Sequence, residues 1–262
     1  MLLFVPTPIG NLDDISKRAL LALNEAEVIF CEDTRVTKKL LNLLNIPLNK
    51  KFISMHSHNE DKVIKNIDKN ELITKKCVYV SDAGMPGISD PGSKLIQFAQ
   101  QNKIPYSVIP GANAALTAFV ASGFEGEFCF IGFLPHKGKE RENKLKEVIN
   151  SKKVSILYES PHRIEKLINE LKKLIPNKEI FLAKEISKIH ETFIKGKVKD
   201  IELENTKGEW VVVIDKAKKE NKLSLNYEDI LNLPLPLKEK SKLLAKISDK
   251  SAKEIYKELQ EK

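Results

Sequence analysis

The sequence has 262 residues, of which 44 are Lys or Arg and 36 are Asp or Glu, so its formal net charge is +8. This length suits two modest domains with a sizeable hydrophobic core, and no segment approaches the roughly 18 continuous apolar residues of a membrane span. The first residues, MLLFVPTP, lack the basic segment and long apolar core of a secretion signal, so we expect a soluble cytoplasmic protein without a membrane partner.

The positive charge favours an anionic partner such as nucleic acid, but only weakly, because Lys is spread along the whole chain. Three isolated cysteines, Cys31, Cys77 and Cys129, lie in or beside apolar runs. They predict buried thiols in a reducing compartment, with neither a disulfide framework nor a zinc site. His56 and His58 form an H-x-H pair that no further Cys or carboxylate completes, so no metal site is predicted.

The first part of the chain alternates short strand-like runs with helical patterns, which is typical of an α/β domain with a largely parallel sheet. Strands are predicted at residues 2–6, 28–33, 52–56, 77–83 and 106–110. Helices are predicted at residues 15–26, 36–45, 59–73, 93–101 and 112–122. We assign residues 1–115 to this N-terminal domain.

Beyond Gly123 the strand-like runs follow one another with fewer helical patterns between them. Strands are predicted at residues 128–135, 154–160, 179–186, 191–198 and 208–215, and helices at 139–150 and 162–175. This pattern predicts a second α/β domain, mixed and partly antiparallel, which we place at residues 116–215.

Residues 216–262 differ from both domains. A polar, linker-like segment at 216–226 precedes three short amphipathic helices at 227–233, 236–248 and 251–261. This tail holds 12 Lys against 8 Asp and Glu, a net charge of +4. If one part of the chain meets a polyanion first, the tail is therefore the best candidate.

The loop after the fourth predicted strand, SDAGMPGISDPGSK, is rich in glycine and proline. Its segment from Gly87 to Lys94 is close to the phosphate-binding pattern G-x-x-x-x-G-K-[ST], but Ser93 precedes Lys94, and Asp82 and Asp90 would add negative charge beside a phosphate. Carboxylates at strand ends instead suit a polar, partly cationic ligand, and an adenosyl sulfonium compound fits this description.

Two further loops follow predicted strands and precede predicted helices. The first, PTPIGN, holds one glycine and lacks the G-x-G-x-x-G dinucleotide fingerprint. The other, VIPGANAALTA, places Gly111 where a helix begins, which lets the backbone approach a ligand closely. Each loop alone is compatible with a simple turn, but together at successive strand ends they favour a ligand site.

Six ordered segments carry a resemblance to a known family. They are PTPIGNLDDISKRAL, CEDTR, SDAGMPGISDPG, VIPGANAALTA, FIGFLP and YESPHR. In this order they resemble the tetrapyrrole (corrin/porphyrin) methylase superfamily, and within it the branch that methylates small-subunit ribosomal RNA. The similarity runs from about Leu2 to Ile214, and the tail resembles that branch's helix-turn-helix-like extension.

The resemblance implies a two-domain class III methyltransferase fold that binds S-adenosyl-L-methionine between its domains, usually in a homodimer. It also implies methylation of the ribose 2′-oxygen of a cytidine in the decoding region of 16S ribosomal RNA, either free or in the assembled small subunit. Carried over by position, the cofactor contacts are Pro8, Asp82, Ala83, Gly84, Pro86, Ile88, Ser89, Gly111, Ala112, Asn113, Ala114, Tyr158, Glu159 and Ser160.

A ribose hydroxyl attacks a methyl group well only after its proton leaves, so a base or a cation is expected nearby. Asp33 and Arg35 directly follow the second predicted strand and would orient or deprotonate the hydroxyl; alternatively they cap the next helix and pair with each other. Because side chains alternate along a strand, at most one of Glu32 and Asp33 faces the site, and we choose Asp33. Lys184 is the candidate cation of the second domain, or else an ordinary solvated strand residue.

Two further groups have both a binding and a structural interpretation. Lys137, Lys139 and Arg141 form a basic segment suited to RNA phosphates, although such segments are more often solvated. Three aromatic residues would stack on a base, but each lies in an apolar strand run, and we expect core packing. They are Phe133, Tyr158 and Trp210.

Three functions follow from these observations. The first is an RNA ribose methyltransferase. The second is a small-molecule tetrapyrrole methylase, against which the basic helical tail argues. The third is a non-catalytic RNA-binding assembly factor on the same scaffold, against which the three cofactor loops argue.

Overall fold

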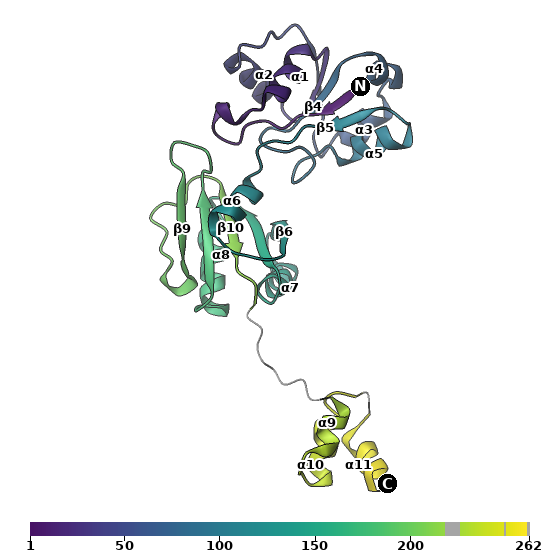
Figure 1. Ribbon diagram of the computed structural model, residues 1–262, viewed down its shortest axis with the longest axis vertical. Helices are drawn as coiled ribbons and strands as arrows, with labels where there is room; N and C mark the ends of the chain where they lie inside the picture. The colour runs from purple at the N-terminus through teal and green to yellow at the C-terminus, as the bar shows by residue number, and fades with distance from the viewer. Residues whose placement is uncertain (218–225, 249, 261–262) are drawn as a thin grey trace. The chain divides into compact units, whose positions relative to one another are not determined.

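The computed structural model describes residues 1–217, 226–248 and 250–260. The chain forms two compact units, residues 1–217 and 218–262, each of which is described by itself (Figure 1). Residues 218–225 of the predicted linker at 216–226 lie outside the described residues.

The first lobe of residues 1–217 is built on a five-stranded sheet that is parallel, as predicted, and has the strand order β3-β2-β4-β1-β5. Its strands are β1 (Leu2–Phe4), β2 (Val28–Cys31), β3 (Lys51–Ser54), β4 (Cys77–Val80) and β5 (Tyr106–Val108). Its helices are η1 (Leu12–Asp14), α1 (Lys17–Glu25), α2 (Thr34–Leu43), α3 (Glu60–Lys65), α4 (Lys69–Thr74) and α5 (Ser93–Gln101).

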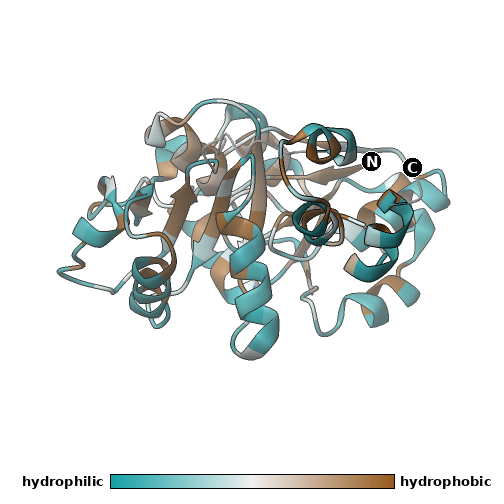
Figure 2. Ribbon diagram, turned by 90° about the horizontal axis from the view of Figure 1, so that it is seen from below, coloured by the Kyte–Doolittle hydropathy of each residue, from teal (hydrophilic) through white to brown (hydrophobic). Residues whose placement is uncertain are grey.

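Strands β2 and β4 are buried on both faces, because helices cover both sides of the sheet. Ile29 and Cys31 pack with residues of α1 and α2, whereas Val28 and Phe30 pack with residues of α4 and α5. In Figure 2 the strands are accordingly mostly hydrophobic, while the outer turns of the helices are hydrophilic. With helices on both faces of the sheet, the loops at the strand ends remain available to form a site.

The second lobe contains a mixed sheet in the order β6-β7-β10-β8-β9, which confirms the predicted mixed architecture. Only β6 and β7 are parallel neighbours in it. Its strands are β6 (Phe128–Phe133), β7 (Val154–Glu159), β8 (Glu179–Lys184), β9 (Thr192–Lys197) and β10 (Trp210–Ile214). Helices α7 (Gly138–Ile149) and α8 (Ile164–Leu174) cover one face, with the turn η2 (Val198–Asp200), and α6 (Ala114–Ser122) covers the other. The domain boundary at residue 116 stays a prediction.

The second unit is the predicted helical extension, with α9 (Tyr227–Asn232), α10 (Leu237–Leu244) and α11 (Ala252–Gln260). A small core of Ile230, Leu244 and Ile255 holds the three helices together. Asn226 and Asp229 form a capping box at the start of α9. None of the helices in the described ranges is both long and apolar enough to cross a membrane.

The loop after β1 joins the two lobes through close backbone contact. A Cβ atom on Gly10 would lie 2.8 Å from the carbonyl carbon of Ser187 and 2.9 Å from the carbonyl oxygen of Ile186. The Asn11 amide donates to Ser187 Oγ at 3.0 Å, and this hydroxyl donates to Asp14. Glycine at position 10 is therefore required by the space between the lobes.

We expect Gly10→Ala to destabilise the protein by about 1–3 kcal/mol, because the added methyl group meets backbone that cannot swing away. Thermal unfolding followed by circular dichroism measures the effect. Gly196→Ala is the matched control, since the new Cβ would make an ordinary 3.7 Å contact with Ile201. Equal unfolding midpoints for the two variants would contradict the tight joint.

Candidate active site

A cavity of about 490 Å³ lies where the loops at the strand ends of the two lobes meet. Many of the predicted cofactor contacts line it: Asp82, Ala83, Gly84, Ile88, Ser89, Asn113, Ala114, Tyr158, Glu159 and Ser160. Other predicted contacts, Pro8, Pro86, Gly111 and Ala112, are not among its lining residues. Residues that we did not predict also contribute, notably Glu32, Asp90 and Glu209.

Sheet topology explains why residues far apart in sequence meet here. Strands β2 and β4 are parallel neighbours, so Glu32 and Asp82, which follow them, lie at the same sheet edge. In the second lobe β10 is antiparallel to β7, and its first residue, Trp210, pairs with Glu159, the last residue of β7. Each lobe therefore presents one sheet edge to the cavity.

The three loops of the first lobe lock one another in place. Thr7 and Gly84 exchange two backbone hydrogen bonds of 3.0 and 3.1 Å. A Cβ on Gly111 would lie 2.3 Å from Pro6 Cγ, so the lack of a side chain at position 111 makes room for the first loop. These contacts give the loops a fixed shape around the cavity.

The glycine-rich loop after β4 is held at its far end by a buried carboxylate. The Gly92 amide donates to Glu60 Oε1 at 3.0 Å, and Gly92 has φ +129° beside the ring of Tyr79. Lys94 instead pairs with exposed Asp61 at 2.8 Å and does not line the cavity. The loop therefore lacks the lysine that a phosphate cradle needs.

Three carboxylates in the cavity wall have no cationic partner among the described residues. They belong to Glu32, Asp82 and Asp90, and none of them takes part in an ion pair. Burial raises the pKa of each above its usual value, and the negative charges of the neighbouring carboxylates raise it further. None of the lining residues is Lys, Arg or His. The cavity thus favours a cationic ligand and disfavours phosphate.

We predicted that Asp33, and not Glu32, faces the site, but the residue that faces the cavity is Glu32. Glu32 lines it, whereas Asp33 caps α2 by accepting from the Arg35 amide at 2.8 Å and pairs with the Arg35 guanidinium at 2.6 Å. Hydrogen bonds from Arg35 lower the pKa of Asp33 to about 2. The structure therefore has the capping arrangement that we considered as the alternative.

Lys184 does not line the cavity either. Its Nζ donates to the Asn205 carbonyl at 3.2 Å and lies 5.5 Å from the centre of the Trp210 ring. Trp210 is buried, as the core interpretation predicts, and Tyr158 is half-buried. For Phe133 that interpretation is wrong, because its side chain is 53% exposed and lines the cavity.

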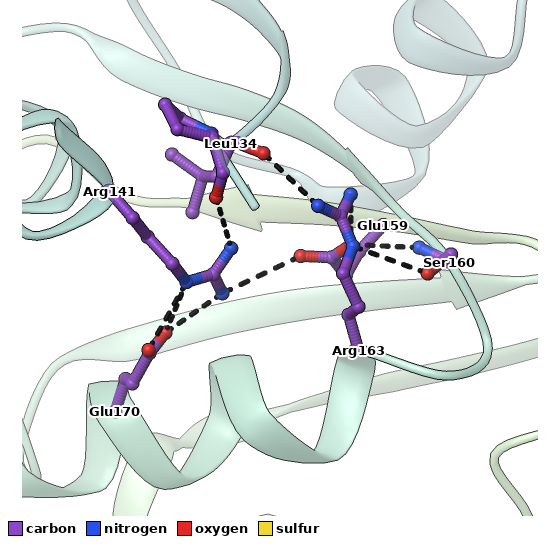
Figure 3. Close-up of polar contacts among 7 residues, drawn as sticks. Leu134, Arg141, Glu159, Ser160, Arg163 and Glu170 are labelled. Atoms are coloured by element: carbon purple, nitrogen blue, oxygen red, sulfur yellow. Dashed lines mark hydrogen bonds and ion pairs between the residues drawn. The ribbon is translucent and has the colours of Figure 1, made fainter. Parts of the chain in front are cut away.

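A buried charge network supports the wall of the second lobe (Figure 3). Glu159 pairs with Arg163 at 2.7 Å and lies 3.7 Å from Arg141, which also pairs with Glu170 at 2.8 Å. Arg141 is only 2% exposed, so neither interpretation of the basic segment, contact with RNA phosphates or a solvated face, holds for this residue. The sequence offers no local signal for the part of this network that joins Glu159, Arg141 and Glu170, because these residues lie on β7, α7 and α8.

The cysteines are not all buried as predicted. Cys31 and Cys77 are, but Cys129 on β6 is exposed. His56 and His58 lie with ring centres 6.0 Å apart, and the described residues contain no group of three or more His, Cys, Asp or Glu placed to hold a metal ion.

The sequence model of the tetrapyrrole (corrin/porphyrin) methylase family matches residues 1–202 of the chain. The chain belongs to this family. A 49% identical relative in Campylobacter fetus subsp. fetus, ribosomal RNA small subunit methyltransferase I, matches over 99% of both chains. The protein of the same name in Helicobacter pylori strain J99 is 42% identical over 98% of this chain and 96% of its own.

A solved structure shows the same fold. The methyltransferase CobJ aligns with a TM-score of 0.62 at 18% sequence identity, covering 82% of this chain and 94% of CobJ. In this chain the fold places one edge of each lobe's sheet at the same cavity.

We expect Asp82→Asn to raise the stability of the ligand-free protein at pH 7. The raised pKa means that the folded state holds this proton more tightly than the unfolded state does. Stability from this group is therefore present at low pH and is lost as pH rises from the usual value near 3.8 through the raised pKa. Asparagine removes this loss, and its side-chain oxygen still accepts from the Asp33 amide.

Thermal unfolding of both proteins between pH 4 and pH 8 measures this effect. The gap in midpoint between Asp82→Asn and the unsubstituted protein should be largest at neutral pH and close as the pH falls. Glu142→Gln, on an exposed position of α7, is the control for loss of one negative charge. A lower midpoint for Asp82→Asn at pH 7 would contradict the unbalanced acidic cluster.

Proposed function

We propose that this protein is an S-adenosyl-L-methionine-dependent methyltransferase that methylates the ribose 2′-oxygen of a cytidine in the decoding region of 16S ribosomal RNA. One observation carries the cofactor assignment: Glu32, Asp82 and Asp90 line one cavity, and none of the described residues that line it is basic. The family and the ribosomal RNA in the names of the relatives support the reaction and the substrate.

The residues of the cavity fit this cofactor chemically. S-adenosyl-L-methionine carries a positive sulfonium and a positive ammonium group, and both are attracted by carboxylates that lack other partners. The backbone from Asp82 to Ser89, together with Asn113, supplies further polar groups along the same wall. When bound, the cofactor supplies the electrophilic methyl group. The protein's own task is to orient the two reactants and to exclude water.

Glu32 is the carboxylate that accepts the proton of the attacking hydroxyl in this proposal. It lines the cavity at the end of β2. Its pKa is raised most by burial and then by the negative charges of Asp90 and Asp82. A base is more effective when its pKa lies closer to the working pH. Asp33, whose pKa is about 2, is a much weaker base and already accepts hydrogen bonds from Arg35.

The remaining parts of the proposal concern assembly and location. We propose that the enzyme acts as a homodimer in the cytoplasm on the small-subunit RNA or the assembled subunit. Exposed apolar side chains support a second copy: Leu116 and Val120 on α6 are 48% and 78% exposed, and Phe128 is 42% exposed. The basic tail is the candidate for the first contact with RNA phosphates.

The assay that tests this function offers labelled methyl donor to small subunits that lack the modification, followed by nuclease mapping. We expect label on the ribose of a single cytidine. In the same assay Asp82→Asn should require more cofactor, with about tenfold weaker binding by calorimetry, because a carboxylate that faces the cationic ligand is gone. Label that appears only on a porphyrin precursor supports the tetrapyrrole methylase instead, and no label at all supports the assembly factor.

The base assignment is tested by Glu32→Gln. We expect kcat to fall by about 10²- to 10⁴-fold, with a much smaller change in cofactor affinity, because the amide cannot accept the proton. Asp33→Asn is the matched control on the adjacent residue, and it should alter stability more than kcat. Similar kcat losses for the two variants, or a loss confined to Asp33→Asn, would assign the base to another residue.

A further inference from the structure

Phe133 is exposed where a strand residue of its size is ordinarily packed. It is the last residue of β6, its side chain is 53% exposed, and it lines the cavity. The other strand-end aromatic residues at the cavity are covered: Trp210 is 3% exposed, and Tyr158 is half-buried. Such an exposed aromatic ring loses favourable burial unless a ligand covers it.

The backbone of β6 turns Phe133 out of the strand pattern. In an unbroken strand Phe133 would share a face with Ile131, which packs into the core under α7 and α8. The pairing of β6 with β7 shifts register between Phe130 and Gly132, and Gly132 has φ +71°. A bulge of this kind re-aims the side chain that follows it.

The ring is also mounted on a fixed support. The Arg163 guanidinium carbon lies 5.8 Å from the centre of the Phe133 ring, and the Tyr158 ring meets it edge-on at 5.7 Å. Arg163 is itself held by Glu159 at 2.7 Å and by the Leu134 carbonyl at 3.2 Å (Figure 3). Because Arg163 and Tyr158 hold the Phe133 ring in one position, the ring forms a preorganised flat surface.

We propose that the ring of Phe133 stacks on a base of the RNA strand that enters the cavity. This inference rests on the proposed function. Unpaired RNA bases are recognised by stacking on exposed aromatic rings, and a ribose that reacts in a cavity must bring its base out of the helix. The exposed cations Lys137 and Lys139 follow Phe133 closely in the chain, where they are placed to hold the adjoining phosphates. The adenine of the cofactor is the less suitable occupant, because no phosphate adjoins it for these lysines to hold.

Phe133→Ala tests this assignment. We expect the KM for the RNA substrate to rise about tenfold or more, with cofactor affinity by calorimetry unchanged. Phe133→Trp should keep the affinity for RNA, whereas Phe133→Leu, which is apolar but has no π face, should lose it. Cys129→Ala, an exposed residue of the same strand outside the cavity, is the control for general effects on β6.

The outcomes separate this inference from the proposed function. If the unsubstituted enzyme methylates RNA and Phe133→Ala or Phe133→Leu does so with unchanged KM, the stacking surface is refuted while the function stands. A loss of cofactor affinity in Phe133→Ala equal to the rise in KM assigns the ring to the adenine and also overturns the proposal. If the unsubstituted enzyme labels no RNA, the function fails first, and direct RNA binding by the same variants still decides the role of the ring.

Discussion

Three half-buried carboxylates with no cationic partner among the described residues organise the site. Glu32, Asp82 and Asp90 follow parallel strands or sit in the loop beyond them, so the sheet brings their charges to one edge whatever their mutual cost. The pKa of each is raised, first by burial and then by the charges of neighbouring carboxylates, so the ligand-free fold disfavours their ionised forms. Loops locked by the Thr7–Gly84 bridge and by Glu60 prevent the wall from relaxing. A cationic ligand stabilises the ionised carboxylates, so the cavity favours binding of such a ligand.

In the wall of the second lobe, by contrast, the buried carboxylate of Glu159 has cationic partners. Glu159 is fully buried, but Arg163 and Arg141 offset its charge, and it serves as an anchor for the end of β7. One of its oxygens has no hydrogen-bond partner, and its distance of 3.7 Å from Arg141 leaves only the Coulomb attraction. Such compensated buried charges fix geometry more than they add stability. One wall thus supplies net charge, and the other supplies position.

The sequence was sufficient for most of the fold, because alternation and helical periodicity are local signals that the burial pattern of each strand and helix obeys. The loops of the site could be located for the same reason, since they follow predicted strands. What failed depended on contacts across the chain. Arg141 looked like a surface cation until the fold placed Glu170 and Glu159 beside it. Asp33 and Glu32 differ only in which way one strand end turns, and a bulge that no pattern announces exposes Phe133.

The distribution of charge explains how an acidic cavity can serve a polyanionic substrate. The chain carries a net charge of +8, yet none of the basic side chains in the described part of the chain lines the cavity. Phosphates are therefore attracted to the outer surface and repelled from the interior, while a ribose and its base carry no charge and can enter. The positive cofactor reduces the negative charge of the interior further, so the two substrates assist each other electrostatically. Positive charge outside and negative charge inside together select the neutral sugar as the part of the RNA that reacts.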